Sequence, residues 1–404
     1  MRAIVFHGVG DIRVDTVPEP KIKDPSDAII KITASAICGT DLHMVRGTMA
    51  MMEPGTILGH EGVGIVQEVG PGVRNLSVGD RVVVASTIAC GYCSYCRSGY
   101  YSQCDNANPQ GKLAGTAFFG GPKMTGPFQG LQAEYARVPF ANVGCVKLPD
   151  TIDDAKAILL SDIFPTGYFG AKLAEIRSGN TVAIFGCGPV GIFTIISAKL
   201  LGAGRVLAID SIPSRLDMAK KAGAEVINFE KEDPVDAILS LTGSIGVDRV
   251  IDAVGIDAQI PSSGPAAQKL EQQRERYAKE LKQVAPQTGQ KGDSWKPGSA
   301  PSLVLEWGVQ ALAKAGTLSI IGVYPETLQE FPLGKAMEKN ITMNMGNCNH
   351  RKYLSRLVDL VASGAVDPSK FLTKVCPLSE AVDAYKHFDK REEGWLKVEI
   401  LPGR

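Results

Sequence analysis

The chain has 404 residues, with 43 basic and 43 acidic side chains, no formal net charge and 44% hydrophobic residues. This length predicts two or three domains with sizeable cores, at roughly 100–200 residues per domain. A neutral chain without a clustered Lys/Arg run has no electrostatic footprint for nucleic acid or an anionic membrane, so we expect neither as a partner. The apolar runs are too short to span a bilayer, and the N-terminus lacks the features of a secretory signal. We therefore expect a cytoplasmic protein that starts at Met1.

Residues 1–146 are typical of a β-rich, barrel-like domain, because short alternating apolar runs are separated by Gly, Pro and Asp. Near Asp150 the pattern changes to strands and helices in alternation, which predicts a parallel α/β sheet. This second pattern is interrupted by residues 256–302, which contain a charged, amphipathic helix. After Tyr324 a helix and a last strand, WLKVEIL, follow, and we expect this tail to pack against the first domain.

Four of the nine cysteines lie at Cys90, Cys93, Cys96 and Cys104. An odd number of cysteines in a long chain favours metal binding over a disulfide framework. Two short spacers and one longer loop bring four thiolates to a closed tetrahedral site with no open position, so we predict structural zinc in the lobe 90–104. A disulfide pair and an iron–sulfur cluster, which also uses four cysteines, are the alternatives.

A candidate phosphate loop of the form G-x-G-x-x-G contains Gly186, Gly188, Pro189, Val190 and Gly191. The pattern alone is weak in a chain with 44 glycines. Here, however, it follows the strand TVAIF and opens a helix, and the next predicted strand ends in Asp210. We expect the loop to approach a pyrophosphate and Asp210 to accept hydrogen bonds from an adenosine ribose, which favours NAD over NADP. An ordinary tight turn is the alternative.

Two further turns hold potential metal ligands, in the segments Ile37-Cys38-Gly39-Thr40-Asp41-Leu42-His43 and Gly59-His60-Glu61-Gly62-Val63-Gly64. A lone buried Cys or His is more often a packing residue than a ligand. Together with the cysteine cluster and the phosphate loop, these segments resemble the zinc-dependent medium-chain alcohol dehydrogenases. The family signature G-H-E-x-x-G-x(5)-G-x-x-V is matched by Gly59, His60, Glu61, Gly64, Gly70 and Val73.

The resemblance extends over essentially the whole chain and implies an α/β protein of two domains. A β-rich, GroES-like catalytic domain is expected over 1–162 and 345–404. A Rossmann domain with a doubly wound parallel sheet is expected over 163–344, with 256–302 as an insertion.

The resemblance also implies a catalytic zinc ion held by Cys38 and His60, with Glu61 close to the metal. Many family members supply a third cysteine, whereas this chain has Asp162 at the corresponding place, as in the formaldehyde dehydrogenase branch. Two anions, Cys38 and Asp162, with a neutral imidazole balance Zn²⁺ as two thiolates and an imidazole do. The alternative is that Asp162 merely caps a helix.

Further roles follow from the resemblance alone. Thr40 is expected to contact the substrate oxygen, and His43 to end a proton relay near bulk solvent; a surface His43 without a role is the alternative. The expected cofactor contacts are Thr166 and Val254, the backbone of Gly322 and Val323, Arg215 along the adenosine, and Lys397 at the pyrophosphate. For Lys397 the alternative is a solvated lysine at a strand edge. His7, His350 and His387 lie outside the motifs and are interpreted as structural or surface residues.

These features together predict an NAD-linked alcohol dehydrogenase with one catalytic and one structural zinc ion per chain. Zinc lowers the pKa of a substrate hydroxyl, and hydride passes to the nicotinamide. The alternatives are a formaldehyde dehydrogenase or aldehyde dismutase that retains NAD, and a polyol or threonine dehydrogenase. A non-catalytic member is disfavoured because no catalytic ligand is lost. The expected partners are a small alcohol or aldehyde and further copies of the chain, as a dimer or tetramer.

The insertion leaves three hypotheses open. Its helix, over 266–285, carries an apolar stripe of Leu270, Tyr277, Leu281 and Val284 that must be buried somewhere. The segment follows a predicted strand whose carboxyl end borders the cofactor cleft. The stripe is therefore expected to lie over the adenosine half of NAD as a lid, against another subunit, or on the surface as a loosely attached excursion.

Overall fold

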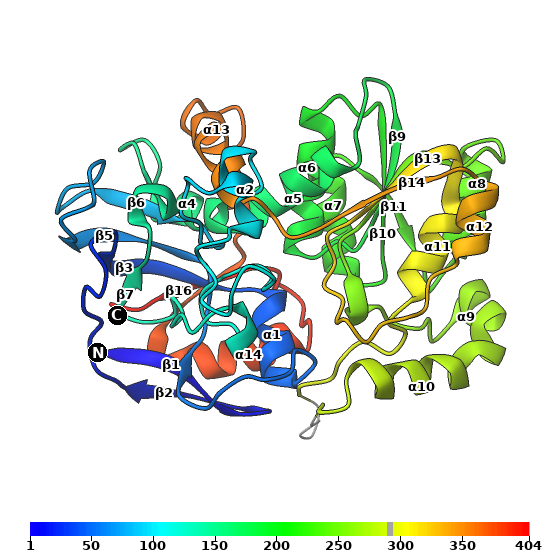
Figure 1. Ribbon diagram of the computed structural model, residues 1–404. Helices are drawn as coiled ribbons and strands as arrows, with labels where there is room; N and C mark the ends of the chain where they lie inside the picture. The colour runs from blue at the N-terminus through cyan, green and yellow to red at the C-terminus, as the bar shows by residue number, and fades with distance from the viewer. Residues whose placement is uncertain (289–293, 404) are drawn as a thin grey trace. The chain divides into compact units, whose positions relative to one another are not determined.

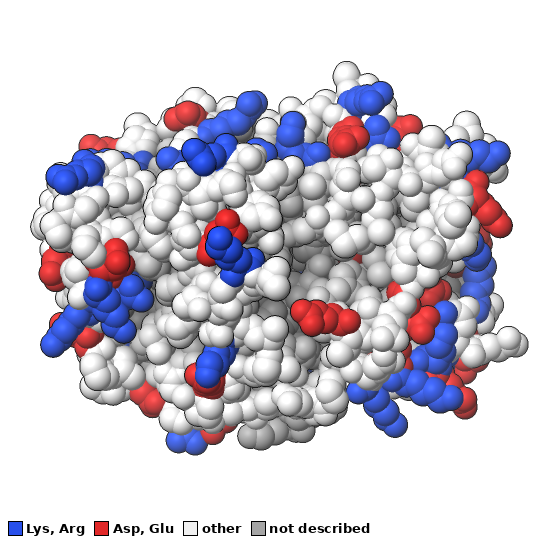
Figure 2. Space-filling model, in the orientation of Figure 1, with Lys and Arg blue, Asp and Glu red and all other residues white. Residues whose placement is uncertain are grey.

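The computed structural model describes residues 1–288 and 294–403, which form two compact units (Figure 1). Unit 1 comprises Met1–Pro165, Gln287–Lys296 and Asn347–Arg404, and unit 2 comprises Thr166–Pro286 and Pro297–Gly346. Among the described helices, none combines the length and apolar character needed to cross a membrane. On the face shown in Figure 2, basic and acidic side chains are interspersed.

Unit 1 is built on two sheets, one with the order β15-β16-β3-β5-β6-β8, to which β7 adds by pairing with β3, and one with the order β2-β1-β4. Its strands are β1 Arg2–Gly8, β2 Asp11–Thr16, β3 Ala28–Ile37, β4 Thr56–Ile57, β5 Gly62–Val69, β6 Arg81–Val84, β7 Tyr135–Val138, β8 Cys145–Lys147, β15 Lys374–Pro377 and β16 Val398–Leu401. Its helices are α1 Gly39–Arg46, α2 Ser94–Arg97, α3 Ala141–Gly144, α4 Asp154–Ser161, α13 His350–Ala362 and α14 Ala381–Asp389. The C-terminal strand β16 pairs antiparallel with β3, so the tail of the chain returns to this unit.

The pairing of β3 with β5 determines where the first ligand candidates lie. The two strands are antiparallel, with Ser35 opposite Gly62. The carboxyl end of β3 therefore lies beside the amino end of β5. Cys38 directly follows β3 and His60 closely precedes β5, so the sheet brings together two residues that are distant in sequence.

Unit 2 contains a six-stranded sheet in the order β11-β10-β9-β12-β13-β14, and every pairing in it is parallel. Its strands are β9 Thr181–Phe185, β10 Arg205–Asp210, β11 Glu225–Asn228, β12 Val247–Asp252, β13 Leu312–Ile320 and β14 Thr342–Met345. Its helices are α6 Pro189–Leu200, α7 Pro213–Lys221, α8 Pro234–Leu241, α9 Gly264–Leu270, α10 Arg274–Val284, α11 Leu303–Ala311 and α12 Leu333–Glu338, while α5 (Ile163–Leu173) contains the unit boundary. The predicted doubly wound, Rossmann-type sheet is confirmed, with the order reversing between β9 and β12.

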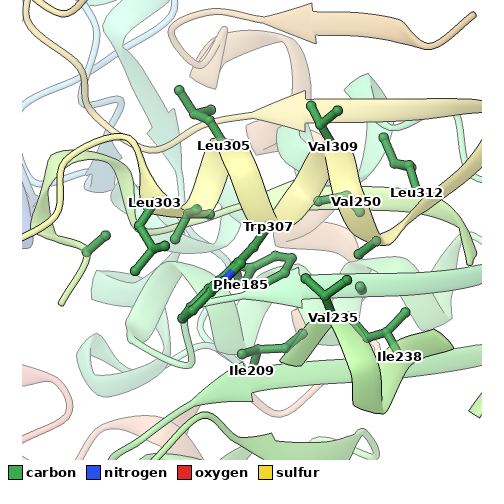
Figure 3. Packing of buried hydrophobic residues seen from close by; sticks show 14 of the residues in the cluster. Phe185, Ile209, Val235, Ile238, Val250, Leu303, Leu305, Trp307, Val309 and Leu312 are labelled. Carbon is green, nitrogen blue, oxygen red and sulfur yellow. The ribbon is translucent and has the colours of Figure 1, made fainter. Parts of the chain in front are cut away.

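The core of unit 2 lies between this sheet and α11. The rings of Phe185 on β9 and Trp307 on α11 stack with centroids 6.3 Å apart (Figure 3). Leu303 and Val309 on the same helix are also buried. Strands buried on both faces need continuous apolar runs, which explains why the sequence of these strands is rich in Val and Ile.

The inserted helix differs from its prediction in two respects. It is broken into α9 and α10 by a 3₁₀ turn at Glu271–Gln273. Its stripe packs within unit 2, because Leu270 and Tyr277 belong to the core cluster and Val284 is buried, whereas Leu281 is only half-buried. Arg276 forms an ion pair with Glu306 of α11 at 2.5 Å. The hypotheses that the stripe packs on another subunit or is loosely attached are therefore wrong.

One segment within the insertion, of which residues 287–288 and 294–296 are described, belongs to unit 1, and the chain returns to unit 2 at Pro297, whereas the sequence predicted all of 256–302 in the Rossmann domain. Trp295 is 4% exposed and packs in the core cluster that includes α1 and α14. Its backbone N–H donates to Asp389 Oδ2 at 2.6 Å, and Asp389 Oδ1 accepts from Arg46 Nε at 2.7 Å. Both side chains of this ion pair are 1% exposed. The insertion is thus anchored at α1, the helix that follows Cys38.

Candidate functional site

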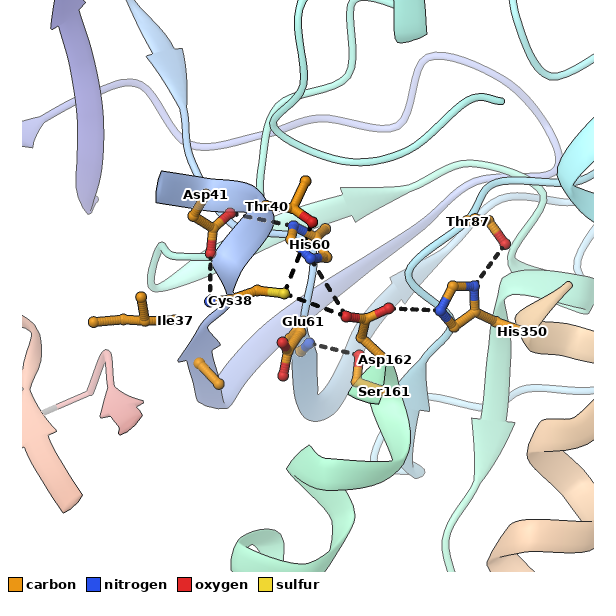
Figure 4. Close-up of polar contacts among 12 residues, drawn as sticks. Ile37, Cys38, Thr40, Asp41, His60, Glu61, Thr87, Ser161, Asp162 and His350 are labelled. Atoms are coloured by element: carbon orange, nitrogen blue, oxygen red, sulfur yellow. Dashed lines mark hydrogen bonds and ion pairs between the residues drawn. The ribbon is translucent and has the colours of Figure 1, made fainter. Parts of the chain in front are cut away.

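Four potential metal ligands from three segments of unit 1 meet at one point (Figure 4). These residues are Cys38, His60, Glu61 and Asp162, all of them buried, and their ligand atoms lie within 4.8 Å of one another. Asp162 Oδ2 lies 3.5 Å from Cys38 Sγ and 3.6 Å from His60 Nε2. Although Asp162 occupies the position after α4, its side chain turns toward the other ligand candidates, so it does more than end a helix.

Asp41 orients two members of this set. Its Oδ1 lies 3.2 Å from His60 Nδ1, and its Oδ2 accepts from the Cys38 N–H at 2.9 Å. Gln132 Nε2 also donates to Oδ2, at 3.3 Å. Because Nδ1 faces Asp41, Nε2 of His60 is directed toward Cys38 and Asp162. A carboxylate behind a ligand histidine is a common device of zinc sites. Asp41 lay within the quoted motif, but no role for it followed from the sequence pattern.

The position of Lys397 corrects the role expected from the sequence. The ammonium donates to Glu61 Oε1 at 2.5 Å and to the Ile37 carbonyl at 3.0 Å, and the residue is fully buried. It is therefore neither a solvated lysine nor free to contact a pyrophosphate while this ion pair holds. The sequence could not reveal the pairing, because Glu61 and Lys397 are brought together only by the β16–β3 pairing.

Burial and neighbouring charges perturb the titration of all four groups. Burial raises the pKa of the Cys38 thiol, and it raises the pKa of Glu61 to about 7 even though Lys397 opposes this. Burial opposes protonation of His60, yet Asp41 and Cys38 raise its pKa well above the ordinary value. Burial also favours the neutral form of Asp162, but hydrogen bonds from His350 and His60 hold its pKa well below the ordinary value.

This donor set fits a divalent cation. One thiol, one imidazole and two carboxyl groups share a buried space, an arrangement that is costly unless a positive charge balances it. Among the described residues, Glu61 Oε2 has no hydrogen-bond partner. With Glu61 held by Lys397, the remaining sulfur, nitrogen and oxygen ligands match a zinc site that keeps one position open.

Thr40 and His43 both lie on α1, close to this set. Thr40 Oγ1 is 3.9 Å from Cys38 Sγ. His43 is 4% exposed, and its Nδ1 lies 2.9 Å from Thr48 Oγ1. This histidine is therefore buried, so the alternative of a surface residue without a role is wrong, and so is the expectation that its side chain lies near bulk solvent.

The second ligand set is formed by Cys90, Cys93, Cys96 and Cys104, whose sulfur atoms also lie within 4.8 Å of one another. The Cys93 and Cys104 sulfur atoms are 3.9 Å apart, and those of Cys90 and Cys96 are 4.0 Å apart. None of the nine cysteines, all of which lie in the described part of the chain, forms a disulfide. The backbone N–H groups of Tyr92 and Cys93 and the Asn106 amide donate to Cys90 Sγ, as is expected of a thiolate ligand. The cluster fits a closed zinc site.

Loss of one of these cysteines is expected to act on stability. Cys93→Ser should lower the zinc content by one ion per chain and leave a largely insoluble or strongly destabilised protein, because a structural zinc ion contributes directly to folding. Thermal unfolding and metal analysis measure the effect. Cys145→Ser, which alters a buried cysteine of the same core outside the cluster, should keep both metals. Equal behaviour of the two variants would contradict a structural metal.

The glycine loop of unit 2 fits a bound dinucleotide. Gly186 has φ +91°, and a Cβ at Gly191 would lie 1.9 Å from the Gly186 carbonyl oxygen, so neither position accepts a side chain. At Gly188 the only described heavy atom within 4 Å of a Cβ is Arg215 Nη1, at 3.7 Å. There is therefore open space next to Gly188, at the amino end of α6, whose first two residues are Pro189 and Val190. A pyrophosphate fits such a helix end.

Asp210 lies at the carboxyl end of β10 and shapes the same loop. Its Oδ2 accepts from the Cys187 N–H at 2.8 Å, and its Oδ1 accepts from Ser211 and Ile212 at 2.7 and 3.0 Å. The carboxylate is thus held against the glycine loop at Cys187, the residue before Gly188. This is the place where a ribose hydroxyl meets an acidic residue in dinucleotide-binding sheets.

Three other predicted contact residues converge on the reversal point of the sheet. A Cβ at Gly186 would lie 2.6 Å from Val254 Cγ2, and one at Gly322 would lie 2.2 Å from the Gly255 nitrogen. The Ile256 N–H donates to the Val323 carbonyl at 3.1 Å. Val254, Gly322 and Val323 are thus adjacent to the glycine loop, while Thr166, the first residue of unit 2, lies on α5.

Sequence and structure comparisons agree on the class of protein that this fold and these ligand sets define. Residues 24–150 match the alcohol dehydrogenase GroES-like domain, and residues 189–268 match the zinc-binding dehydrogenase domain. The uncharacterized zinc-type alcohol dehydrogenase-like protein AdhB of Bacillus subtilis (strain 168) is 37% identical over 405 residues, with 100% of both chains covered.

Two relatives with assigned activities are also similar. Glutathione-independent formaldehyde dehydrogenase of Pseudomonas aeruginosa is 35% identical over 402 residues, or 96% of this chain and 94% of the relative. Among solved structures, alcohol dehydrogenase TADH from Thermus sp. ATN1 has a TM-score of 0.81 and 34% identity over 99% of each chain. The chain therefore belongs to the zinc-type alcohol dehydrogenase family, which consists of oxidoreductases with a GroES-like domain and a Rossmann-type sheet.

Proposed function

We propose that the protein is a zinc-dependent, NAD-linked alcohol dehydrogenase that interconverts a primary or secondary alcohol with its aldehyde or ketone. The observation that carries the proposal is that one chain contains both an open ligand set at Cys38, His60 and Asp162 and a glycine loop with an acidic residue at the end of the next strand. When bound, zinc lowers the pKa of a substrate hydroxyl and NAD accepts hydride from the carbon.

The chain's own residues hold and orient these groups. Cys38, His60 and Asp162 are the proposed zinc ligands, with Asp41 directing His60 Nε2 toward the site. Thr40 is proposed to accept the proton of the substrate hydroxyl in a hydrogen bond. His43 is proposed to pass the proton on, with Thr48 fixing the orientation of its ring.

In the second unit, Gly188 and Arg215 are proposed to receive the pyrophosphate and adenosine, and Asp210 the ribose hydroxyls. Thr166, Val254, Gly322 and Val323 are proposed to surround the nicotinamide. A structure with bound NAD would test each of these contacts.

The substrate class is proposed from two loops of unit 1. A surface hollow is lined by Met51 and Met52 of the loop after α1, with Met124 from the segment 111–130. Glu53 and Lys123 flank it and form an ion pair at 3.7 Å. Flexible thioether side chains adapt to different apolar shapes, so medium-length or aromatic alcohols suit this surface better than polyols do.

The proposed reaction is tested by following NADH absorbance with purified protein over a panel of alcohols and aldehydes, together with a zinc count. Two zinc ions per chain and NAD-dependent oxidation of at least one alcohol support the proposal. A fully zinc-loaded protein that oxidises no member of the panel contradicts it. Size determination of the same sample tests the further proposal of a dimer or tetramer.

Asp210→Asn is expected to lower the ratio of kcat/KM for NAD to kcat/KM for NADP by about 10- to 100-fold, so that the preference for NAD becomes weaker. The substitution weakens the hydrogen bonds to the ribose and removes the charge that repels a 2′-phosphate. Most of the change should appear as a lower kcat/KM for NAD. A wild-type protein that prefers NADP would contradict this role of Asp210.

A second candidate is a formaldehyde dehydrogenase or aldehyde dismutase that keeps its NAD bound. Two features favour it: an aspartate, Asp162, stands in the ligand set where many family members have a third cysteine, and the insertion lies near the strand that carries Asp210. Glu230, which closely follows β11, accepts hydrogen bonds from Ser262 and Ser263 at the start of the insertion. The insertion therefore begins beside the strand that neighbours Asp210. Purified protein that retains NAD through gel filtration, and converts formaldehyde without added cofactor, would favour this candidate over an enzyme that exchanges NAD.

A further inference from the structure

His350 is a buried histidine that the sequence motifs did not include and that the mechanism above does not use. Its Nε2 lies 2.6 Å from Asp162 Oδ1, and its Nδ1 lies 3.1 Å from Thr87 Oγ1 (Figure 4). The residue is 3% exposed. Because an ionised carboxylate can only accept hydrogen bonds, Nε2 donates to Asp162.

The two oxygens of Asp162 are thereby given different roles. Oδ2 faces Cys38 and His60, at 3.5 and 3.6 Å from their ligand atoms. Oδ1 points away from both of these atoms, toward the imidazole of His350. A cysteine in this place has one ligand atom, but an aspartate has two oxygens and a side chain that rotates easily about its last bond. It can therefore bind a metal through one oxygen or through both.

We propose that His350 is a positioning residue of the catalytic metal centre, which holds Asp162 Oδ1 so that only Oδ2 faces the metal. A single oxygen, with Cys38 and His60, gives three protein ligands and leaves the fourth tetrahedral position open for substrate. Two oxygens would occupy that position. This inference rests on the proposed function only in taking the metal at Cys38, His60 and Asp162 to be the catalytic one.

Hydrogen bonds at the start of α13 hold His350 in place. It is the first residue of α13, and the preceding Asn349 accepts hydrogen bonds from the Ser102 N–H at 2.9 Å and from its hydroxyl at 3.0 Å. The Ser102 hydroxyl oxygen also lies 3.0 Å from the Asn347 carbonyl oxygen, so its one hydrogen is shared between two acceptors next to His350. Ser102 lies in the short 3₁₀ turn just before Cys104. The closed cysteine cluster therefore fixes the start of α13, and α13 in turn fixes His350 behind Asp162.

The test compares the metal centres of His350→Ala and His350→Gln with that of the wild type. The matched control is His387→Ala, which removes a 44% exposed imidazole on α14. Zinc retention against a chelator measures metal affinity, and cobalt(II) exchanged into the site reports coordination through its visible absorption. Neither measurement requires substrate or NAD.

We expect His350→Ala to weaken binding of the catalytic metal by about 10- to 100-fold, the usual effect of removing the partner of a metal ligand. The visible bands of the cobalt form should lose intensity as a second carboxylate oxygen joins the coordination sphere. The side-chain amide that His350→Gln introduces can donate to Asp162 Oδ1, so this variant should recover most of both properties. In turnover, kcat should fall while KM for NAD stays unchanged, and His387→Ala should match the wild type throughout.

Unaltered metal affinity and an unaltered cobalt spectrum in folded His350→Ala would overturn the proposal, as would a His350→Gln variant no better than His350→Ala. If His350→Ala does not fold, Thr87→Val retains the imidazole but removes its Nδ1 partner, and it should shift both metal measurements in the same direction by a smaller amount. Failure of the proposed function would look different: the wild type would hold both metals with the expected cobalt spectrum, yet oxidise no alcohol.

Discussion

Cys38→Ala is expected to lower kcat/KM by roughly 10³- to 10⁴-fold, because a catalytic zinc ion supplies several kcal/mol of charge stabilisation that no other group in the site replaces. The sulfur lies 3.5 Å from Asp162 Oδ2 in the open ligand set, so its loss leaves one imidazole and carboxylates as metal ligands. The melting temperature should change little, since the closed cysteine cluster stays intact. Zinc content should fall from two ions per chain to one.

The matched control is Cys376→Ala, which removes a buried cysteine of the same unit that belongs to neither ligand set. It should retain both metals and near wild-type turnover. Wild-type turnover by folded Cys38→Ala with a single zinc ion would exclude the proposed mechanism. A loss of activity in Cys376→Ala as large as in Cys38→Ala would show that packing, and not metal binding, explains the effect.

Arg46→Ala is expected to destabilise the protein by about 3–5 kcal/mol, because it leaves the buried Asp389 carboxylate without its charged partner. Asp389 also accepts from the Trp295 backbone, so the loss should weaken the anchor of the insertion. Denaturant unfolding measures the effect. Cleavage of the insertion by a protease should also become faster. Arg13→Ala, which breaks an exposed pair with Asp11, should cost no more than about 1 kcal/mol. A similar small loss in both variants would show that the buried pair does not hold the insertion.

The glycine loop, the cysteine cluster and the parallel sheet were predictable from the sequence, because each depends on a local pattern of residues. Gly186 and Gly191 must be glycine because of a positive φ and a close approach to the backbone, and such requirements leave a readable motif. Likewise, four cysteines within one short segment can reach a common centre without help from distant residues. For the same reason the alternation of strands and helices in unit 2 predicted a parallel sheet, which the pairings confirm.

For the insertion, the periodicity of apolar residues did not predict which part of the protein the helix packs against. Its apolar stripe predicted that one face must be buried, but not against what, because an amphipathic helix fits a core, a partner or a lid equally well. Only the tertiary structure shows Tyr277 in the core of unit 2 and Trp295 in the core of unit 1. The two residues are close in sequence but pack in different units.

The sequence by itself determined the closed cysteine cluster and the glycine loop, because each consists of residue types at short, fixed spacings. It also determined the family and, through the resemblance, the open ligand set at Cys38, His60 and Asp162, whose members lie far apart in the chain. Only the tertiary structure decided the contacts that tune those sites: Asp41 behind His60, Lys397 on Glu61, and His350 behind Asp162. The last two pairs join the first half of the chain to its C-terminal tail, through the pairing of β16 with β3 and the placement of α13. Contacts of this kind leave no local pattern, since a buried charge needs only one well-placed partner, and that partner can come from any distance along the chain.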